Sequence, residues 1–101
     1  MIVVCGTAKI RPGALASASS KEAMKAMIEA SRREEGCLYY AYGADVLAPD
    51  TIIALEYWKD WAALDAHFKT PHMAVWRKFL GEIGVVERDL KGIEAKEVRV
   101  I

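Results

Sequence analysis

The chain has 101 residues, 53% of them apolar, and its fourteen basic and fourteen acidic side chains cancel. This length suits one domain with a single hydrophobic core, so we expect residues 1–101 to form one domain. A balanced charge excludes the basic surface by which proteins bind nucleic acids or anionic membranes.

The N-terminal segment is apolar, but no basic region precedes it. Lys9 and Arg11 interrupt it well before the length needed to cross a membrane. We therefore expect no export signal and no membrane association. Cys5 and Cys37 are the only cysteines, and they form no zinc-site spacing. Reduced thiols in a cytoplasmic protein are the expectation.

The first third of the chain predicts a strand and then a helix. Residues 2–10 alternate as a strand that is nearly apolar on both faces. Pro12 and Gly13 end this pattern, and apolar residues then recur at helical spacing over residues 15–35. We expect Gly36 to follow the helix in a left-handed conformation.

Two further strands follow. Cys37–Ala44 has the aromatic content of a strand, and Thr51–Trp58 alternates as the next one. Asp45–Asp50, which contains Pro49, is expected to join them as a hairpin connection. The alternation places Glu56 in an otherwise apolar row of the second strand.

Two helix starts are clear in the second half of the chain. Asp60 is a good N-cap for a short helix that ends near His67. Thr70 and Pro71 supply the N-cap and the first residue of a second helix, since proline has no N–H to lose there. His72 then lies in the first turn of that helix.

The C-terminal part is expected to end in a strand. Gly81 and Gly84 weaken the second helix toward its end. Val85–Leu90 is predicted to add one helical turn before Gly92, and Ile93–Ile101 alternates as a final strand.

This order matches the ferredoxin-like βαββαβ plan, an α+β fold whose four-stranded antiparallel sheet carries helices on one face. Its strand order is 4-1-3-2, which places Cys5 and Cys37 two strand spacings apart. That separation is on the order of 9 to 10 Å, beyond the roughly 7 Å that a disulfide spans. No disulfide is expected within the chain.

The sheet has a second face that the helices leave uncovered. Because the first and third strands are apolar on both faces, this open face is expected to pack against the sheet of an identical subunit. A homodimer is therefore predicted.

The chain resembles the antibiotic biosynthesis monooxygenase family, and in particular its small quinol-monooxygenase-like members. The resemblance covers nearly the whole chain and includes RPG after the first strand, EEGCLYYAYGAD, ALEYW and ALDAHFKTPHM. Its most specific part is the pattern E-x-W followed by A-x-x-A-H-x-x-T-P-H. In this sequence the pattern is formed by Glu56, Trp58, Ala63, Ala66, His67, Thr70, Pro71 and His72.

The resemblance implies a dimeric α+β barrel in which each subunit encloses a cavity between sheet and helices. It also implies oxidation of a quinol or phenolic small molecule by O2, without a metal, flavin or other cofactor. Deprotonation of the substrate would give an anion that passes an electron to O2. The radical pair would recombine and lose water to give a quinone.

Such a reaction needs a base and aromatic walls. His72 and His67 are the candidate bases, and Glu56 either orients one of them or pairs with a cation of the partner subunit. The candidate walls for the substrate ring are Trp58, Trp76, Tyr40 and Tyr42. Trp61, Phe68 and Phe79 are expected to pack in the hydrophobic core and to have no functional role.

Each histidine also has a simpler role. His67 could bond backbone carbonyls at the end of its helix, and His72 would be kept neutral by the helix dipole. No metal site is expected, because the two histidines are five residues apart across a proline and the sequence places no third ligand beside them.

Three other functions stay open. Haem-degrading relatives of this fold use an asparagine near the end of the first strand, and this chain has no asparagine. An isomerase of a small hydroxyketone or phosphosugar is the second, and recognition of a phosphate would need a basic cluster. The candidates are Arg32, Arg33, Arg77 and Lys78, although we expect these residues to form solvated helix faces. A dimer that binds a small ligand without catalysis is the third.

Overall fold

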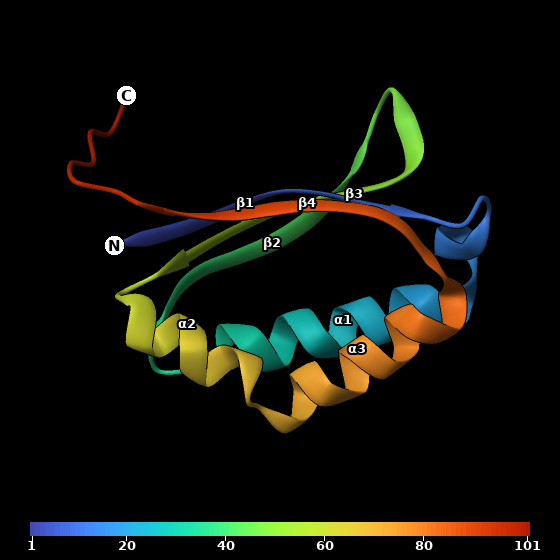
Figure 1. Ribbon diagram of the computed structural model, residues 1–101, viewed down its shortest axis with the longest axis horizontal. Helices are drawn as coiled ribbons and strands as arrows, with labels where there is room; N and C mark the ends of the chain where they lie inside the picture. The colour runs from blue at the N-terminus through green and yellow to red at the C-terminus, as the bar shows by residue number, and fades with distance from the viewer.

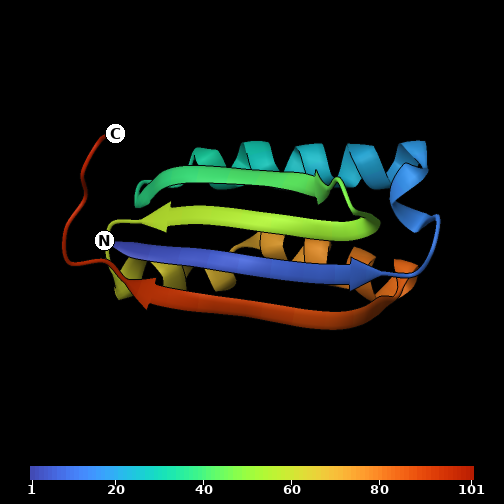
Figure 2. The same ribbon diagram turned by 90° about the horizontal axis from the view of Figure 1, so that it is seen from above.

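The computed structural model describes residues 1–101 and consists of a sheet that lies over a layer of helices (Figure 1). The elements are β1 (Ile2–Ile10), a 3-10 turn η1 (Ala14–Ala16), α1 (Ala18–Arg32), β2 (Cys37–Asp45), β3 (Ala48–Trp58), α2 (Trp61–Phe68), α3 (Pro71–Ile83) and β4 (Val85–Glu94). The strands pair antiparallel in the order β2-β3-β1-β4 (Figure 2). The predicted α+β ferredoxin-like fold and its strand order are confirmed.

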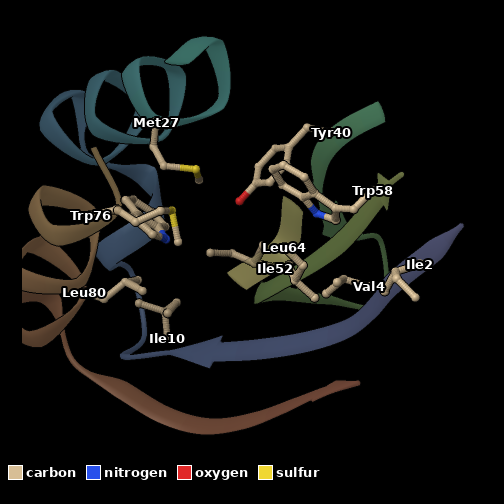
Figure 3. Close-up of a cluster of buried hydrophobic side chains, with 11 residues drawn as sticks. Ile2, Val4, Ile10, Met27, Tyr40, Ile52, Trp58, Leu64, Trp76 and Leu80 are labelled. Atoms are coloured by element: carbon tan, nitrogen blue, oxygen red, sulfur yellow. The ribbon is translucent and has the colours of Figure 1, made fainter. Parts of the chain in front are cut away.

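The core lies between the sheet and the helices. Every second residue of β3, from Ile52 to Trp58, is buried against them, as the alternation predicts. Figure 3 shows Met27 of α1, Trp76 of α3 and the sheet residues Tyr40 and Trp58 converging on one cluster. Tyr40 and Trp58 meet edge to face at a centroid distance of 6.2 Å.

The predicted helix starts are confirmed. Asp60 Oδ1 accepts a hydrogen bond from the Ala63 amide at 2.8 Å, which caps α2. Thr70 Oγ1 accepts from the Met73 amide at 3.4 Å, and Pro71 is the first residue of α3. The break between α2 and α3 is therefore encoded locally.

The first helix is shorter than predicted at both ends. Ser17 caps it by accepting from the Ser20 amide, so the preceding residues form only the 3-10 turn. The helix ends at Arg32, and Gly36 is not left-handed, because positive φ occurs only at Gly6, Gly13 and Gly84. Gly36 is instead buried beside α2.

The C-terminal prediction is wrong. Val85–Glu94 forms strand β4, and residues 95–101 belong to no helix or strand. Gly84, with φ of 86°, ends α3 and turns the chain back along the free edge of β1. The Ala95 amide donates a hydrogen bond to the Met1 carbonyl at 2.8 Å. The charges of β4 suit an edge strand, which is why its sequence resembles a polar helix.

The β2–β3 hairpin is tighter than predicted. Only Val46 and Leu47 separate the strands, and Asp45 Oδ1 accepts from the Leu47 amide at 2.9 Å. Pro49 lies within β3, where the register shifts between the Ala44 and Asp45 pairings. A bulge of this kind accommodates a residue that has no amide hydrogen to donate.

The sheet face opposite the helices is apolar and partly exposed. Ile53 is 43% exposed there, Tyr39 is 47% exposed, and Tyr39 packs on Tyr57 at a centroid distance of 5.2 Å. Cys5 and Cys37 are both free thiols. None of the helices has the combination of length and apolar character needed to span a membrane.

We predict that Gly36→Ala destabilises the fold. A Cβ at position 36 would lie 2.3 Å from the Cβ of Ala63. Relief of such a clash costs about 1 to 3 kcal/mol in the free energy of unfolding. Denaturant titration should show this loss, and Ala63→Gly should remove part of it in the double variant.

Gly81→Ala is the matched control for this prediction. A Cβ at position 81 meets nothing within 4 Å, and alanine is the better helix residue by about 0.5 to 1 kcal/mol. Equal stability of Gly36→Ala and wild type would show that α2 moves away from Gly36 without cost.

Candidate active site

A cavity of about 340 Å³ lies between the sheet and helices α2 and α3. Ala54 and Glu56 of β3 form its floor, and His67, Met73 and Trp76 of the helices line its other side. A larger hollow of about 600 Å³ lies beside α1, but its lining includes neither of the two histidines nor Glu56. The smaller cavity is therefore the candidate active site.

One carboxylate holds both histidines. Glu34 lies in the turn between α1 and β2, and its Oε2 is 2.6 Å from His67 Nδ1 and 2.8 Å from His72 Nε2. Glu34 is separated from the two histidines by 33 and 38 residues in sequence. No spacing rule could have identified it, although it lies in the EEGCLYYAYGAD segment.

This contact fixes the tautomer of His67. An ionised carboxylate only accepts hydrogen bonds, so a neutral His67 carries its proton on Nδ1 and leaves a free lone pair on Nε2. His67 is 1% exposed, and Nε2 is a buried atom without a hydrogen-bond partner. Burial lowers the pKa of His67, although the hydrogen bond that its Nδ1–H donates to Glu34 opposes this effect. His67 is thus a neutral proton acceptor.

His67 does not bond the carbonyls at the end of its helix, as its simpler role would require. Its ring packs instead on Trp58 at a centroid distance of 4.5 Å and beside Tyr40 at 5.4 Å. These contacts hold the imidazole plane while Glu34 holds one of its nitrogens. The ring is fixed by three separate elements of the fold.

Glu56 is buried on the cavity floor and orients neither histidine. It is 5% exposed, and its Oε1 accepts from Trp58 Nε1 at 2.9 Å. Burial raises the pKa of Glu56 to about 7, although the bond from Trp58 opposes this effect. Near neutral pH this carboxyl group is partly protonated.

The predicted aromatic residues divide into two groups. Trp76 and Tyr42 line the cavity, whereas Trp58 and Tyr40 lie behind it in the core. The Tyr40 and Tyr42 hydroxyls are 3.1 Å apart. Burial raises the pKa of Tyr42 to about 12 and that of Tyr40 further, so both are neutral hydroxyls.

Two aromatic residues that were expected only to pack in the core also line the cavity. Trp61 and Phe68 of α2 are 45% and 48% exposed and lie at its edge, while Phe79 packs against the core. Their exposure could not be predicted from helical spacing, because it depends on how far α2 lies from β4.

The four candidates for a basic cluster do not gather at the cavity. Only Arg77 of the four candidates lines the cavity, and its Nη1 donates to the Phe68 carbonyl at 3.0 Å. Arg88 and Lys91 of β4 also line the cavity. Neither was expected there, because a helical turn was predicted over Val85–Leu90 and the final strand only from Ile93. Arg32 is elsewhere, with its Nε on the Tyr40 carbonyl at 2.8 Å.

The expectation of no metal site was based on a missing third ligand. The structure supplies one, because ligand atoms of Glu34, His67 and His72 all lie within 4.8 Å of one another. Two imidazoles and a carboxylate are donors that Zn²⁺ and similar ions accept. That argument against a metal therefore does not hold.

We predict that Glu56 destabilises the fold as the pH rises from 4.5 to 7. The unfolded chain loses the Glu56 proton near pH 4.5, while the folded chain keeps it until about pH 7. The folded state then binds more protons, so stability falls with pH in this window, by up to about 3 kcal/mol. Glu56→Gln keeps the Trp58 bond and should gain stability relative to wild type across this range.

Urea titrations of both proteins at several pH values measure this difference. The lowered pKa of His67 acts in the opposite sense, since its contribution to stability is lost as pH falls below 6.5. It acts in both proteins, so the difference isolates Glu56. A difference that stays constant with pH would contradict the raised pKa.

Comparison with known proteins places these features in a family. The family model described as "Antibiotic biosynthesis monooxygenase" matches residues 1–78. The probable quinol monooxygenase YgiN of Escherichia coli K12 is 31% identical over 84 residues, which cover 75% of this chain and 81% of YgiN. The uncharacterized protein sll1783 of Synechocystis is 37% identical over 75 residues, which cover 70% of this chain and 47% of sll1783. The chain thus spans about half the length of sll1783.

Solved structures agree on the fold. A proposed antibiotic biosynthesis monooxygenase from Deinococcus radiodurans superposes with a TM-score of 0.88 at 24% identity, covering 100% of this chain and 98% of that one. A conserved protein from Methanosarcina mazei gives 0.83 at 26% identity, covering 94% and 92%. With the family model matching more than half of its length, the chain belongs to the antibiotic biosynthesis monooxygenase family.

Proposed function

We propose that this protein is a cofactor-independent monooxygenase that oxidises a quinol or other phenolic molecule with O2. One observation carries the proposal: His67 lines the cavity, and its Nε2 has a free lone pair because the atom has no hydrogen-bond partner. Its opposite nitrogen is held by Glu34 at 2.6 Å. The 31% identity to a probable quinol monooxygenase supports the same class of substrate.

In this mechanism His67 Nε2 removes the proton from a substrate hydroxyl. The Glu34 carboxylate stabilises the imidazolium that forms, since the Nδ1–H already points at Oε2. The substrate anion passes one electron to O2, and the radical pair recombines as a hydroperoxide at a ring carbon. Loss of water then gives the quinone, so one oxygen atom enters the product and the other leaves as water.

The proton transfer is uphill and needs support. A phenol near pKa 10 and a histidine near 6.5 differ by about 3.5 units, or roughly 5 kcal/mol. The lowered pKa of His67 widens this gap. Arg77, Arg88 and Lys91 line the same cavity and would stabilise a phenolate electrostatically. An electron-rich substrate with an acidic hydroxyl fits best.

The same basic residues favour an isomerase as the second candidate. Three cations beside a proton acceptor would also suit a phosphorylated hydroxyketone, whose isomerisation needs proton transfer and no oxygen. Oxygen uptake separates the two functions.

We predict that the protein consumes oxygen with at least one hydroquinone of a panel when no metal and no flavin is added, and that added flavin does not increase the rate. His67→Gln should lower kcat by about 100- to 10,000-fold, since it removes the general base. His72→Gln is the matched comparison and should lose less, because it removes only a partner of Glu34.

Other outcomes of this assay are equally informative. Greater damage in His72→Gln would make His72 the base. Absence of uptake with every quinol, together with tight binding of one, would favour a protein that binds a small ligand without catalysis.

We also propose a homodimer in which two sheets pack through their open faces. The support is the row of partly exposed apolar residues on that face, which includes Val3, Ile53, Leu55 and Tyr57. Their burial would close the open side of the sheet and complete the barrel that the family resemblance implies.

Light scattering after gel filtration should give the mass of two chains at micromolar concentration. Ile53→Asp should give the mass of one chain, since it would bury a charge in the interface. Val75 is 70% exposed on α3, so Val75→Asp is the control and should stay dimeric. A monomeric wild-type protein would refute the proposed dimer.

A further inference from the structure

Three side chains from three separate segments present their donor atoms to one point. Glu34 follows α1, His67 lies in the last turn of α2, and His72 lies in the first turn of α3. Their ligand atoms lie within 4.8 Å of one another, with Glu34 Oε2 in the middle. The arrangement comes from tertiary packing, since the two histidines belong to different helices.

We propose that Glu34, His67 and His72 form a binding site for a divalent transition metal ion such as Zn²⁺. Two imidazole nitrogens and a carboxylate oxygen make a ligand set that suits this class of ion, and water would complete a tetrahedral site. Metal–ligand bonds of about 2.0 to 2.2 Å place tetrahedral ligand atoms roughly 3.3 Å apart. The contacts of 2.6 and 2.8 Å would lengthen by about half an ångström to admit the ion.

The ligands combine access with rigidity. His72 is 22% exposed and Glu34 is 15% exposed, so an ion can reach them from solvent. His67 is buried and packed on Trp58, so its ring is already oriented. The turn that carries Glu34 is held by a bond from the Cys37 amide to its carbonyl at 3.1 Å. Because these two ligands are already held in place, metal binding would cost little conformational entropy.

The ion would lie behind His67 as seen from the cavity. His67 lines the cavity, whereas Glu34 and His72 do not. An ion on Nδ1 is therefore separated from the substrate by the imidazole ring. The ion could not contact O2 or substrate in the cavity. It would act only by changing which nitrogen of His67 carries the proton.

The consequence is inhibition, and this step rests on the proposed function. An imidazole that binds a metal through Nδ1 is neutral with its proton on Nε2. The proton that Nδ1 shares with Glu34 would move to Nε2, and that of His72 would move from Nε2 to Nδ1. No net proton is needed, but His67 Nε2 becomes a donor and can no longer accept a proton from a substrate.

Calorimetric titration of the full chain with Zn²⁺ tests the site without any substrate. We expect one ion per chain, and Co²⁺ should give visible absorption bands of nitrogen and oxygen ligation without a thiolate charge-transfer band. Glu34→Gln and His72→Ala should each weaken binding by about 100-fold or more, since each removes a ligand. Circular dichroism is the check that each variant is folded.

Cys37→Ser is the matched control, because this thiol lies three residues from Glu34 and could bind the ion instead. It should leave the affinity unchanged. Absence of binding at millimolar Zn²⁺, binding that survives both ligand variants, or binding that is lost in Cys37→Ser would overturn the site. If Glu34→Gln unfolds, His72→Ala alone decides, since His72 is partly exposed.

The activity assay tests the inhibition separately. Saturating Zn²⁺ should reduce oxygen uptake by about 10-fold or more, and a chelator should restore it. Unchanged or faster turnover would refute the coupling through His67. Metal binding in a chain that oxidises no quinol would keep the site and refute the oxygenase, so the two proposals fail independently.

Discussion

The hydrogen bonds of the Glu34 carboxylate are the interaction on which the candidate site depends. One oxygen atom accepts from His67 and His72, so it joins the turn after α1 to the end of α2 and the start of α3. The contact with Glu34 fixes the tautomer of His67 that carries its proton on Nδ1, and Nε2 then has no hydrogen-bond partner. Without these hydrogen bonds nothing would fix the proton of His67 on Nδ1, and both the proposed base chemistry and the proposed metal site would lose their support.

Burial shapes the chemistry of the cavity in two opposite directions. It lowers the pKa of His67 and raises that of Glu56 to about 7, because in both groups it disfavours the charged form. Near neutral pH the cavity therefore holds an uncharged base and a partly protonated acid. Such a pair suits an apolar aromatic substrate, which would be repelled by neither group before its own proton is removed.

The sequence predicted the features that depend on local rules. The alternation of β3 and the Thr70–Pro71 helix start are encoded by neighbouring residues, and both were found as expected. The final strand was expected at Ile93–Ile101 and lies instead at Val85–Glu94, because an edge strand tolerates charges that mimic a helix face. Glu34 was missed because its partners are more than thirty residues away in the sequence, and they come together only where α1 packs against α3 in the folded chain.

The proline break explains why two histidines five residues apart can share one carboxylate. On a continuous helix residues at this spacing point in different directions, so their rings could not reach a common atom. Thr70 and Pro71 end α2 and start α3 at a new angle, and Nδ1 of His67 then converges with Nε2 of His72. Because His67 uses Nδ1 for this contact, its Nε2 has no hydrogen-bond partner, and His67 is a residue that lines the cavity. The same break that looked unfavourable for a metal site in the sequence is what brings together the proposed base and the proposed metal ligands.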